Sequence, residues 1–238
     1  MIKIRFSFAR GKALAYLSHL DLMRLLQRAL RRSTLPLAYS QGYNPRLRLN
    51  LALPLPLGVT ANREYGELYL SEKIDPAQLI SSLSAQLPAG LELLGVFEVS
   101  AESSSLAALV AAACYRAKLV DAKEKSLAVV QIERAVSKLM AAEELLMPRS
   151  GKKKKQISDI NIRPYIFELR LDSGLRAVPE VVMLLKAGSD GGVSPFYLLQ
   201  LLDACEPDCG SEARQWSVER ESLYLISNGA LIPLTEGA

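Results

Sequence analysis

The chain has 238 residues, of which 50% are hydrophobic and 23% are charged, and its formal net charge is only +4. This apolar content excludes a disordered chain, and the length suggests one large or two smaller domains. No apolar run reaches the roughly 18–20 uncharged residues of a membrane helix, and the N-terminus lacks the apolar core of a signal peptide. We therefore expect a cytoplasmic protein without a membrane segment.

The first hundred residues predict the element order β-α-β-β-α-β. Alternating apolar residues predict strands, and apolar residues three and four apart predict helices. The expected elements are a strand at 2–8, a helix at 18–33, strands at 46–53 and 64–70, a helix at 75–86 and a strand at 91–99. This order is typical of the ferredoxin-like fold.

A similar order follows a linker of small residues at 101–106. The expected elements are a strand at 112–120, a helix at 125–140, a short strand at 144–148, a hairpin of strands at 163–171 and 176–185, a helix at 194–205 and a strand at 216–226. This half contains one strand more than the ferredoxin-like pattern needs. We therefore predict an α+β protein with two ferredoxin-like (βαββαβ) sandwich domains side by side, covering residues 1–100 and 107–238.

The predicted helix at 18–33 begins with a capping-box-like pattern. Ser18 can accept a backbone N–H, and Asp21 is an acid at the third helical position. Leucines and an alanine then recur at helical spacing and predict one buried face. Because 35–36 is a Leu-Pro pair, the helix should end just before it.

Positive charge is concentrated just after this helix start. No acidic residue lies between Asp21 and Glu64, whereas the same stretch contains Arg24, Arg28, Arg31, Arg32, Arg46, Arg48 and Arg63. Arg24, Arg28 and Arg31 lie at helical positions i, i+4 and i+7, so they share one face of the helix. Such a stripe is often only a solvated helix face, but solvated faces normally mix both signs of charge. The absence of acids therefore favours anion binding.

A turn with two tyrosines follows the helix. Tyr39, Tyr43 and Asn44 belong to a Gly-, Asn- and Pro-containing turn, and Arg46 and Arg48 alternate on the strand after it. We expect the helix arginines, the tyrosines and the strand arginines to converge on one basic groove. Such a groove suits a phosphate backbone whose bases stack on aromatic rings.

Two further basic features lie in the second half. Lys152, Lys153, Lys154 and Lys155 form a run after a glycine, and Arg163 precedes a proline. A lysine run is often a solvated loop, but on a nucleic-acid-binding protein it also supplies non-specific phosphate contacts. Both interpretations stay open. If the lysine run binds nucleic acid, Arg163 extends the same basic surface.

Catalytic and cofactor motifs are sparse. His19, the single histidine, and Asp21 are the acid–base candidates, but residues two apart on a helix point in different directions. The chain has no phosphate-binding glycine loop, dinucleotide motif or metalloprotease motif. Its three cysteines, Cys114, Cys205 and Cys209, do not form a metal-binding pattern. We expect a binding module without a metal or other cofactor, and not an enzyme.

Several short motifs together resemble those of a known bacterial family. They are Ser-His-Leu-Asp at 18–21, Arg-Arg at 31–32, Leu-Pro at 35–36, Tyr-Ser-Gln-Gly-Tyr-Asn-Pro at 39–45, and Pro-Leu at 54–55 with Gly58. Over about the first 70 residues the chain resembles the radical-SAM-linked, or radical-SAM-associated, uncharacterised proteins. The lysine run and the segment at 163–165 are similar to a second conserved block of that family.

The resemblance implies a partner and an RNA context. Members of that family are fused to, or encoded beside, a cobalamin-type radical SAM protein, often near genes for an E/G-type ribonuclease and ribosomal proteins. The leading hypothesis is an RNA-binding accessory module that presents tRNA, rRNA or a ribosomal particle to the radical SAM partner. The alternatives are a metal-independent RNA-processing enzyme that uses His19, and a protein–protein adaptor without RNA binding.

Overall fold

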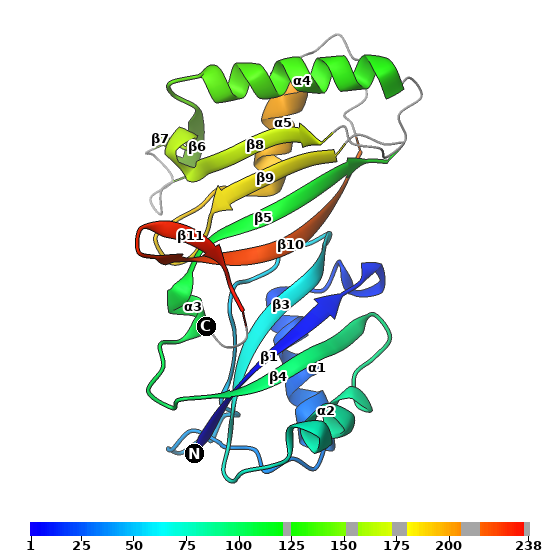
Figure 1. Ribbon diagram of the computed structural model, residues 1–238, viewed down its shortest axis with the longest axis vertical. Coiled ribbons are helices and arrows are strands. Elements are labelled where there is room, and N and C mark those ends of the chain that lie inside the picture. Colours follow the sequence, from blue (N-terminus) through cyan, green and yellow to red (C-terminus); the bar gives the residue numbers. More distant parts are fainter. Residues whose placement is uncertain (121–124, 151–156, 173–179, 206–214, 236–238) are drawn as a thin grey trace. The chain divides into compact units, whose positions relative to one another are not determined.

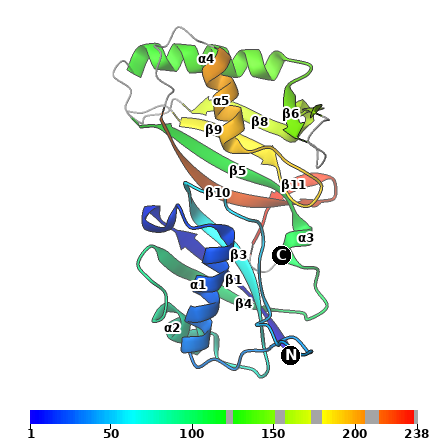
Figure 2. The same cartoon turned by 180° about the vertical axis from the view of Figure 1, so that it is seen from behind.

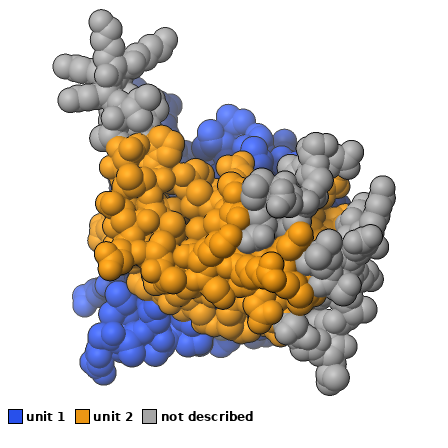
Figure 3. All heavy atoms as spheres, turned by 90° about the horizontal axis from the view of Figure 1, so that it is seen from above, with its two compact units in different colours: residues 1–113, 219–238 blue, residues 114–218 orange. Residues whose placement is uncertain are grey.

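The chain is mixed α+β and divides into two compact units. A computed structural model describes residues 1–120, 125–150, 157–172, 180–205 and 215–235 (Figure 1). Unit 1 comprises Met1–Ala113 and Glu219–Ala238, and unit 2 comprises Cys114–Val218, as coloured in Figure 3. This division differs from the expected 1–100 and 107–238 because the chain from Glu219 onwards belongs to unit 1.

Unit 1 contains the predicted β-α-β-β-α-β order over its first hundred residues. Its elements are β1 (Ile2–Arg10), the 3-10 turn η1 (Lys12–Leu14), α1 (His19–Arg32), β2 (Leu49–Leu51), β3 (Val59–Leu70), α2 (Pro76–Ser84), β4 (Leu91–Val99), α3 (Leu106–Leu109), β11 (Ala230–Pro233), the start of β5 (Val110–Leu119) and most of β10 (Trp216–Ser227). In the sheet, β4 pairs with β1 and β1 with β3, while β2 and β10 both neighbour β3. The pairs β1–β3, β1–β4 and β2–β3 are antiparallel.

The strand predicted at 46–53 is much shorter, because its first residues belong to a loop. Residues 49–51 pair with β3, whereas Leu47 forms an isolated bridge with Tyr39. The backbone N–H of Arg46 donates to Ser40 Oγ (2.9 Å), and its carbonyl oxygen accepts from Ser40 N (2.8 Å). These bonds close a loop across residues 40–46.

Helices α1 and α2 pack on one face of the unit 1 sheet (Figure 2). The buried residues of α1 are Leu22, Leu26, Ala29 and Leu30, as the helical spacing predicts. They share a core with Phe6 and Phe8 of β1 and with Leu68 and Leu70 of β3. The Phe6 ring lies over Gly66, where an added Cβ would be 2.3 Å from Phe6 Cζ. A side chain at Gly66 would therefore displace a core ring.

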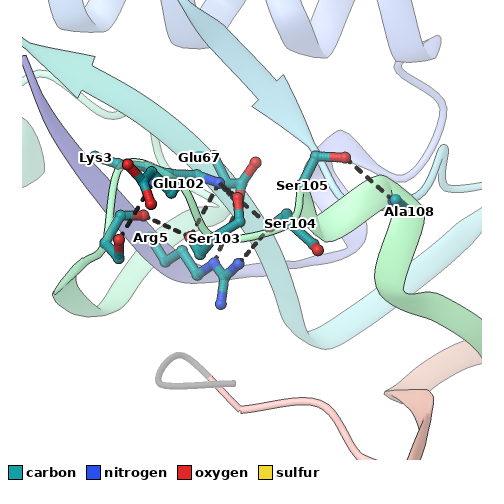
Figure 4. A network of polar contacts seen from close by, with 9 residues as sticks. Lys3, Arg5, Glu67, Glu102, Ser103, Ser104, Ser105 and Ala108 are labelled. Carbon is teal, nitrogen blue, oxygen red and sulfur yellow. Dashed lines mark hydrogen bonds and ion pairs between the residues drawn. The ribbon is translucent and has the colours of Figure 1, made fainter.

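The other face of the same sheet carries a buried ionic cluster (Figure 4). Glu67 Oε1 accepts from Lys3 Nζ (3.0 Å) and Arg5 Nε (3.1 Å), and all three side chains are almost fully buried. Lys3 Nζ also donates to the Ser103 carbonyl oxygen (2.9 Å), and Arg5 Nη2 donates to that of Ser104 (2.7 Å). The cluster thus fixes the segment after β4 on this face.

A second buried ion pair ties the C-terminal segment into unit 1. Arg220 on β10 forms a bidentate pair with Glu64 on β3, with Nε donating to Oε1 at 2.6 Å and Nη2 donating to Oε2. Its two terminal nitrogens also donate to the carbonyl oxygens of Leu53 (3.0 Å) and Pro54 (3.1 Å). In addition, Tyr65 Oη donates to the Leu234 carbonyl oxygen (2.6 Å). These contacts explain why the last segment belongs to the first unit.

Unit 2, as far as the structure describes it, contains the remaining strands and the helices α4 and α5. Its elements are the larger part of β5, α4 (Lys125–Ala141), β6 (Leu146–Ser150), β7 (Ile157–Asn161), the 3-10 turn η2 (Arg163–Tyr165), β8 (Ile166–Asp172), β9 (Glu180–Lys186), α5 (Pro195–Cys205) and the start of β10. β9 lies between β5 and β8, and β6 and β7 form a separate antiparallel hairpin. Overall, the large mixed sheet has the order β4-β1-β3-β10-β5-β9-β8.

Most elements predicted for the second half are present, with shifted ends. The strand predicted at 163–171 begins at Ile166 because Arg163–Tyr165 forms a 3-10 turn around Pro164. The predicted hairpin turn after Asp172 lies outside the described residues. β7 and β11 were not predicted. None of the described helices combines the length and apolar character that a membrane crossing requires.

We predict that Arg220→Ala lowers the free energy of unfolding by about 3–5 kcal/mol, because it leaves the Glu64 carboxylate buried without its partner. Urea denaturation followed by circular dichroism measures the change. Arg134→Ala on α4 is the control: Arg134 is exposed, and its loss should cost less than about 0.5 kcal/mol. A loss below about 1 kcal/mol for Arg220→Ala would contradict the structural role of the pair.

Candidate nucleic-acid interface

The start of α1 is held by the capping pattern that the sequence predicts. Ser18 is the N-cap, and its Oγ accepts from the Asp21 backbone N–H at 3.2 Å. The Ser18 hydroxyl also donates to Asp21 Oδ2 at 2.6 Å, and Arg24 Nη1 donates to Asp21 Oδ1 at 3.2 Å. The Ser18 hydrogen bond is the main cause that lowers the pKa of the Asp21 carboxyl, and the charges of Arg24 and Arg28 lower it further. The carboxylate is thus fully engaged at the helix start.

The solvent-facing side of α1 is basic. Arg24, Arg28, Arg31 and Arg32 are all exposed. Arg24 is paired with Asp21, and Arg32 donates to the Gln86 side-chain oxygen (3.1 Å) and carbonyl oxygen (2.9 Å). Arg28 and Arg31 make no hydrogen bond or ion pair within the part of the chain that the structure describes. These two guanidinium groups are therefore available to an external anion.

The tyrosine-bearing turn is an exposed loop beyond the end of α1. Tyr43 is fully exposed at 106%, Tyr39 is 39% exposed, and Asn44 and Arg46 are also exposed. Gly42 has a φ of 127°, a conformation that other residues rarely adopt. The loop thus presents an aromatic ring and a guanidinium group to solvent.

Arg48 does not join the arginines of α1. Leu68 and Leu70 pack in the core beneath α1, so Tyr69 between them lies on the opposite face of the sheet. The Arg48 guanidinium carbon lies 3.8 Å from the Tyr69 ring centroid, and Nη1 lies 3.0 Å from Met1 Sδ. Because strand side chains alternate between faces, Arg48 and the α1 stripe are separated by the sheet. The single groove expected from the sequence therefore does not include Arg48.

His19 and Asp21 do not form a catalytic pair. His19 Nδ1 is buried and has no hydrogen-bond partner among the described residues, while the Asp21 carboxylate is bonded to Ser18 and Arg24. A general acid or base needs an atom within reach of a substrate proton, and the enclosed Nδ1 does not provide one, although the His19 ring as a whole is partly exposed. The described residues also contain no group of three or more His, Cys, Asp or Glu side chains suited to a metal.

The Arg163 side chain makes hydrogen bonds within unit 2. Its Nη2 donates to the Met140 carbonyl oxygen near the end of α4 (3.0 Å), and its Nη1 donates to that of Ile166 (3.2 Å). The side chain therefore ties the end of α4 to the start of β8. The other basic residues expected in this half, Lys152, Lys153, Lys154 and Lys155, lie outside the described residues.

Sequence reasoning missed a buried arginine that shapes the loops beside α1. Arg10 is only 1% exposed and donates to the carbonyl oxygens of four residues, which are Ala15 (3.3 Å), Leu17 (3.3 Å), Pro56 (3.2 Å) and Val59 (2.6 Å). Burial lowers the pKa of its guanidinium; the charge of Glu64 raises this pKa, and that of Arg220 lowers it further. The signal available in the sequence was an arginine at the end of a strand whose apolar residues alternate with Lys3, Arg5 and Ser7.

A small hollow lies behind these loops. It has a volume of about 320 Å³, and its lining includes Arg10, Lys12, Asn62, Glu92 and Glu219. Asn62 Nδ2 donates to Glu219 Oε1 at 2.8 Å across its rim. Because cationic, anionic and neutral groups are mixed in this lining, the hollow indicates no particular class of ligand.

These observations define the class of protein, which is a mixed α+β chain with an exposed basic helix face. The chain belongs to the family described as an uncharacterized protein conserved in bacteria (DUF2344), whose model matches residues 3–195. This agrees with the bacterial family of uncharacterised proteins that the sequence motifs resemble.

Comparisons outside this family are uninformative about function. No curated protein matches the chain in sequence. The structure is similar to a chain of the crystal structure of a Cbf5-Nop10-Gar1 complex, with a TM-score of 0.44 and 9% identity over 93% of this chain and 48% of that chain. The chain thus spans about half the length of that neighbour. At this TM-score the similarity supports no inference about activity.

We predict that Ser18→Ala raises the pKa of the Asp21 carboxyl toward its ordinary value of 3.8, because the hydroxyl donates to the ionised form. In the parent, the lowered pKa contributes stability above the unfolded-state pKa, and this contribution is lost as pH falls through the folded-state pKa. Carboxyl carbon NMR titration measures the value.

Arg24→Ala is the comparison variant for this titration. It should raise the Asp21 pKa less than Ser18→Ala does, since the Ser18 hydrogen bond is the larger cause. An unchanged Asp21 pKa in Ser18→Ala would contradict the proposed cap geometry.

Proposed function

We propose that the chain is a non-catalytic RNA-binding accessory module whose RNA-contacting surface is the arginine face of α1. The observation that carries the proposal is that Arg28 and Arg31 are exposed and make no hydrogen bond or ion pair with another described residue. They also lie in a stretch without acidic residues between Asp21 and Glu64. Leaving two guanidinium groups unpaired on one helix face favours an external polyanion as their partner.

The loop beyond α1 supports RNA as the polyanion. Tyr39, Tyr43, Asn44 and Arg46 are exposed there. Exposed aromatic rings beside cationic groups suit unpaired bases, which stack on the rings while the arginines neutralise the phosphates. A tRNA, an rRNA segment or a ribosomal particle provides both unpaired bases and phosphates.

We further propose that each unit is a ferredoxin-like sandwich. The strand order β4-β1-β3-β2 in unit 1, with α1 and α2 between successive strands, supports this for the first unit. The order β10-β5-β9-β8, with α4 and α5 in the corresponding connections, supports it for the second. The β6–β7 hairpin is then an insertion after α4. This arrangement leaves the outer side of α1 free for a ligand.

The proposed protein partner is a radical SAM enzyme. Its support is the resemblance to radical-SAM-linked proteins carried by the motifs between Ser18 and Gly58. The chain has only three cysteines, and their spacing does not provide the ligands of an iron–sulfur cluster. In this proposal the partner holds the cluster, and this chain supplies RNA affinity.

We predict that Arg28→Ala combined with Arg31→Ala weakens RNA binding across sequences and flattens its dependence on salt. For single-stranded RNA, the slope of log K against log salt should fall in magnitude by about 1.4, or about 0.7 for each lost phosphate contact. Fluorescence anisotropy with labelled cellular RNA at several salt concentrations measures both quantities. This pair is preferable to one that includes Arg32, because Arg32 also bonds to Gln86.

The control is Arg134→Ala combined with Arg170→Ala in unit 2. It also removes two exposed guanidinium groups, of which Arg170 is ion-paired with Glu168, and it should change the salt slope much less. If both double variants lose affinity equally, the α1 face is not the interface.

Two other outcomes would replace the proposal. RNA cleavage that persists in EDTA and disappears in His19→Ala would support the metal-independent enzyme. Tight binding of the radical SAM partner without any RNA affinity at low salt would support the protein–protein adaptor.

A further inference from the structure

Three large apolar side chains are exposed around the start of α1. Tyr16 is 83% exposed, Leu20 is 65% exposed and Leu57 is 56% exposed. The backbone N–H of Gly58 donates to the Ala15 carbonyl oxygen at 2.8 Å, so the segments that carry Tyr16 and Leu57 are directly bonded to each other. Leu20 follows in the first turn of α1. We call these three residues the Tyr16 patch.

Arg10 is the reason that the Tyr16 patch faces outward. Its buried guanidinium group donates hydrogen bonds to the carbonyl oxygens of Ala15 and Leu17, which flank Tyr16. It also donates to those of Pro56 and Val59, which lie on either side of Leu57. With the flanking carbonyl groups turned inward, the side chains between them are directed to solvent. The exposed rings and methyl groups are therefore held by a buried polar network. Exposed apolar side chains on segments that are bonded to each other are candidates for contact with a ligand.

The Tyr16 patch continues into the arginine face of α1. On a helix, Leu20, Arg24 and Arg31 share one stripe, since they are separated by four and seven residues. The stripe from Leu20 to Arg31 is about 16 Å long at 1.5 Å per residue. The nearest acid, Asp21, has its carboxylate engaged by Ser18 and Arg24. Arg24 is itself paired with Asp21, and Arg28 and Arg31 follow it on α1 without an ion pair to another described residue. Apolar side chains followed by such a basic helix face are complementary to a ligand with an apolar end and an anionic backbone.

We propose that the Tyr16 patch is a stacking platform for the unpaired bases of single-stranded RNA, whose phosphates continue along the arginine face of α1. This rests on the proposed function and names its substrate class. A duplex buries its base faces in its own stack, so it presents phosphates to the arginines but no ring to Tyr16. A single strand presents both, and stacking is available to every base because each has a π-face. The platform therefore favours single strands without strong sequence preference.

The experiment compares three labelled probes of about 12 nucleotides, a length within the site sizes of single-strand binders. They are oligo(A), an abasic strand with the same phosphates, and a duplex of the same length. Fluorescence anisotropy measures the affinity of the full chain for each. We expect the parent to bind oligo(A) most tightly. Tyr16→Ala should weaken oligo(A) binding by about 5- to 150-fold, leave abasic binding unchanged, and fold like the parent.

Tyr16→Phe keeps the ring and should restore oligo(A) affinity to near the parent value. Leu57→Ser tests the patch with a second residue and should weaken oligo(A) binding without affecting the abasic strand. Phe167→Ala is the matched control, because Phe167 is 44% exposed in unit 2; it should leave all three affinities unchanged.

The outcomes separate this inference from the proposed function. If Tyr16→Ala and Leu57→Ser bind oligo(A) like the parent, while Arg28→Ala with Arg31→Ala loses affinity, the platform is wrong and the RNA-binding module stands. Equal weakening of oligo(A) and abasic binding by Tyr16→Ala also overturns the platform. A parent chain that binds no probe at low salt overturns both proposals and leaves a protein ligand for the patch.

Discussion

The loops beside α1 depend on guanidinium groups that are buried inside unit 1. Arg10 and Arg220 both donate to carbonyl oxygens of the Pro-rich segment at 53–59, and Glu64 neutralises Arg220 through a bidentate pair. A buried charge is tolerated only when it is paired and hydrogen-bonded. The turn before α1, the segment before β3 and strand β10 are therefore held together by one polar network.

The arginines of this chain perform two distinct tasks. Arg5, Arg10 and Arg220 are almost fully buried and organise backbone carbonyl groups or carboxylates. Arg28 and Arg31 project from α1 into solvent. A guanidinium group suits both tasks, because its planar set of donors matches carboxylates, carbonyl oxygens and phosphates alike. The net charge of +4 nevertheless conceals a concentrated basic face, because the acidic residues that offset the positive charge lie outside the stretch between Asp21 and Glu64.

The proposed interface combines a cationic helix face with aromatic and apolar groups near its two ends. Tyr16 and Leu20 lie at the start of α1, and the loop with Tyr43 follows its end. Phosphate contacts supply affinity that salt weakens, while stacking supplies affinity that depends on unpaired bases. A surface with both components distinguishes single strands from duplexes even when it reads no sequence. This property suits an accessory module that presents flexible RNA regions to an enzyme.

Local structure was readable from the sequence alone. The capping pattern of Ser18 and Asp21, the buried leucines of α1 and the β-α-β-β-α-β order of the first hundred residues are present as predicted. These features depend on periodicity and on contacts between residues close in the chain. The position of Arg28 and Arg31 on a face of α1 apart from the buried leucines followed from the same helical spacing.

Only the tertiary structure decided which distant residues act together. It separated Arg48 from α1 by placing it over Tyr69 on the other face of the sheet, and it assigned Arg163 to the end of α4. It also paired Glu64 with Arg220, which are 156 residues apart in the chain, and thereby moved the C-terminal segment into the first unit. The physical reason is that burial and long-range pairing depend on how strands are ordered in the sheet, which no local pattern of residues encodes.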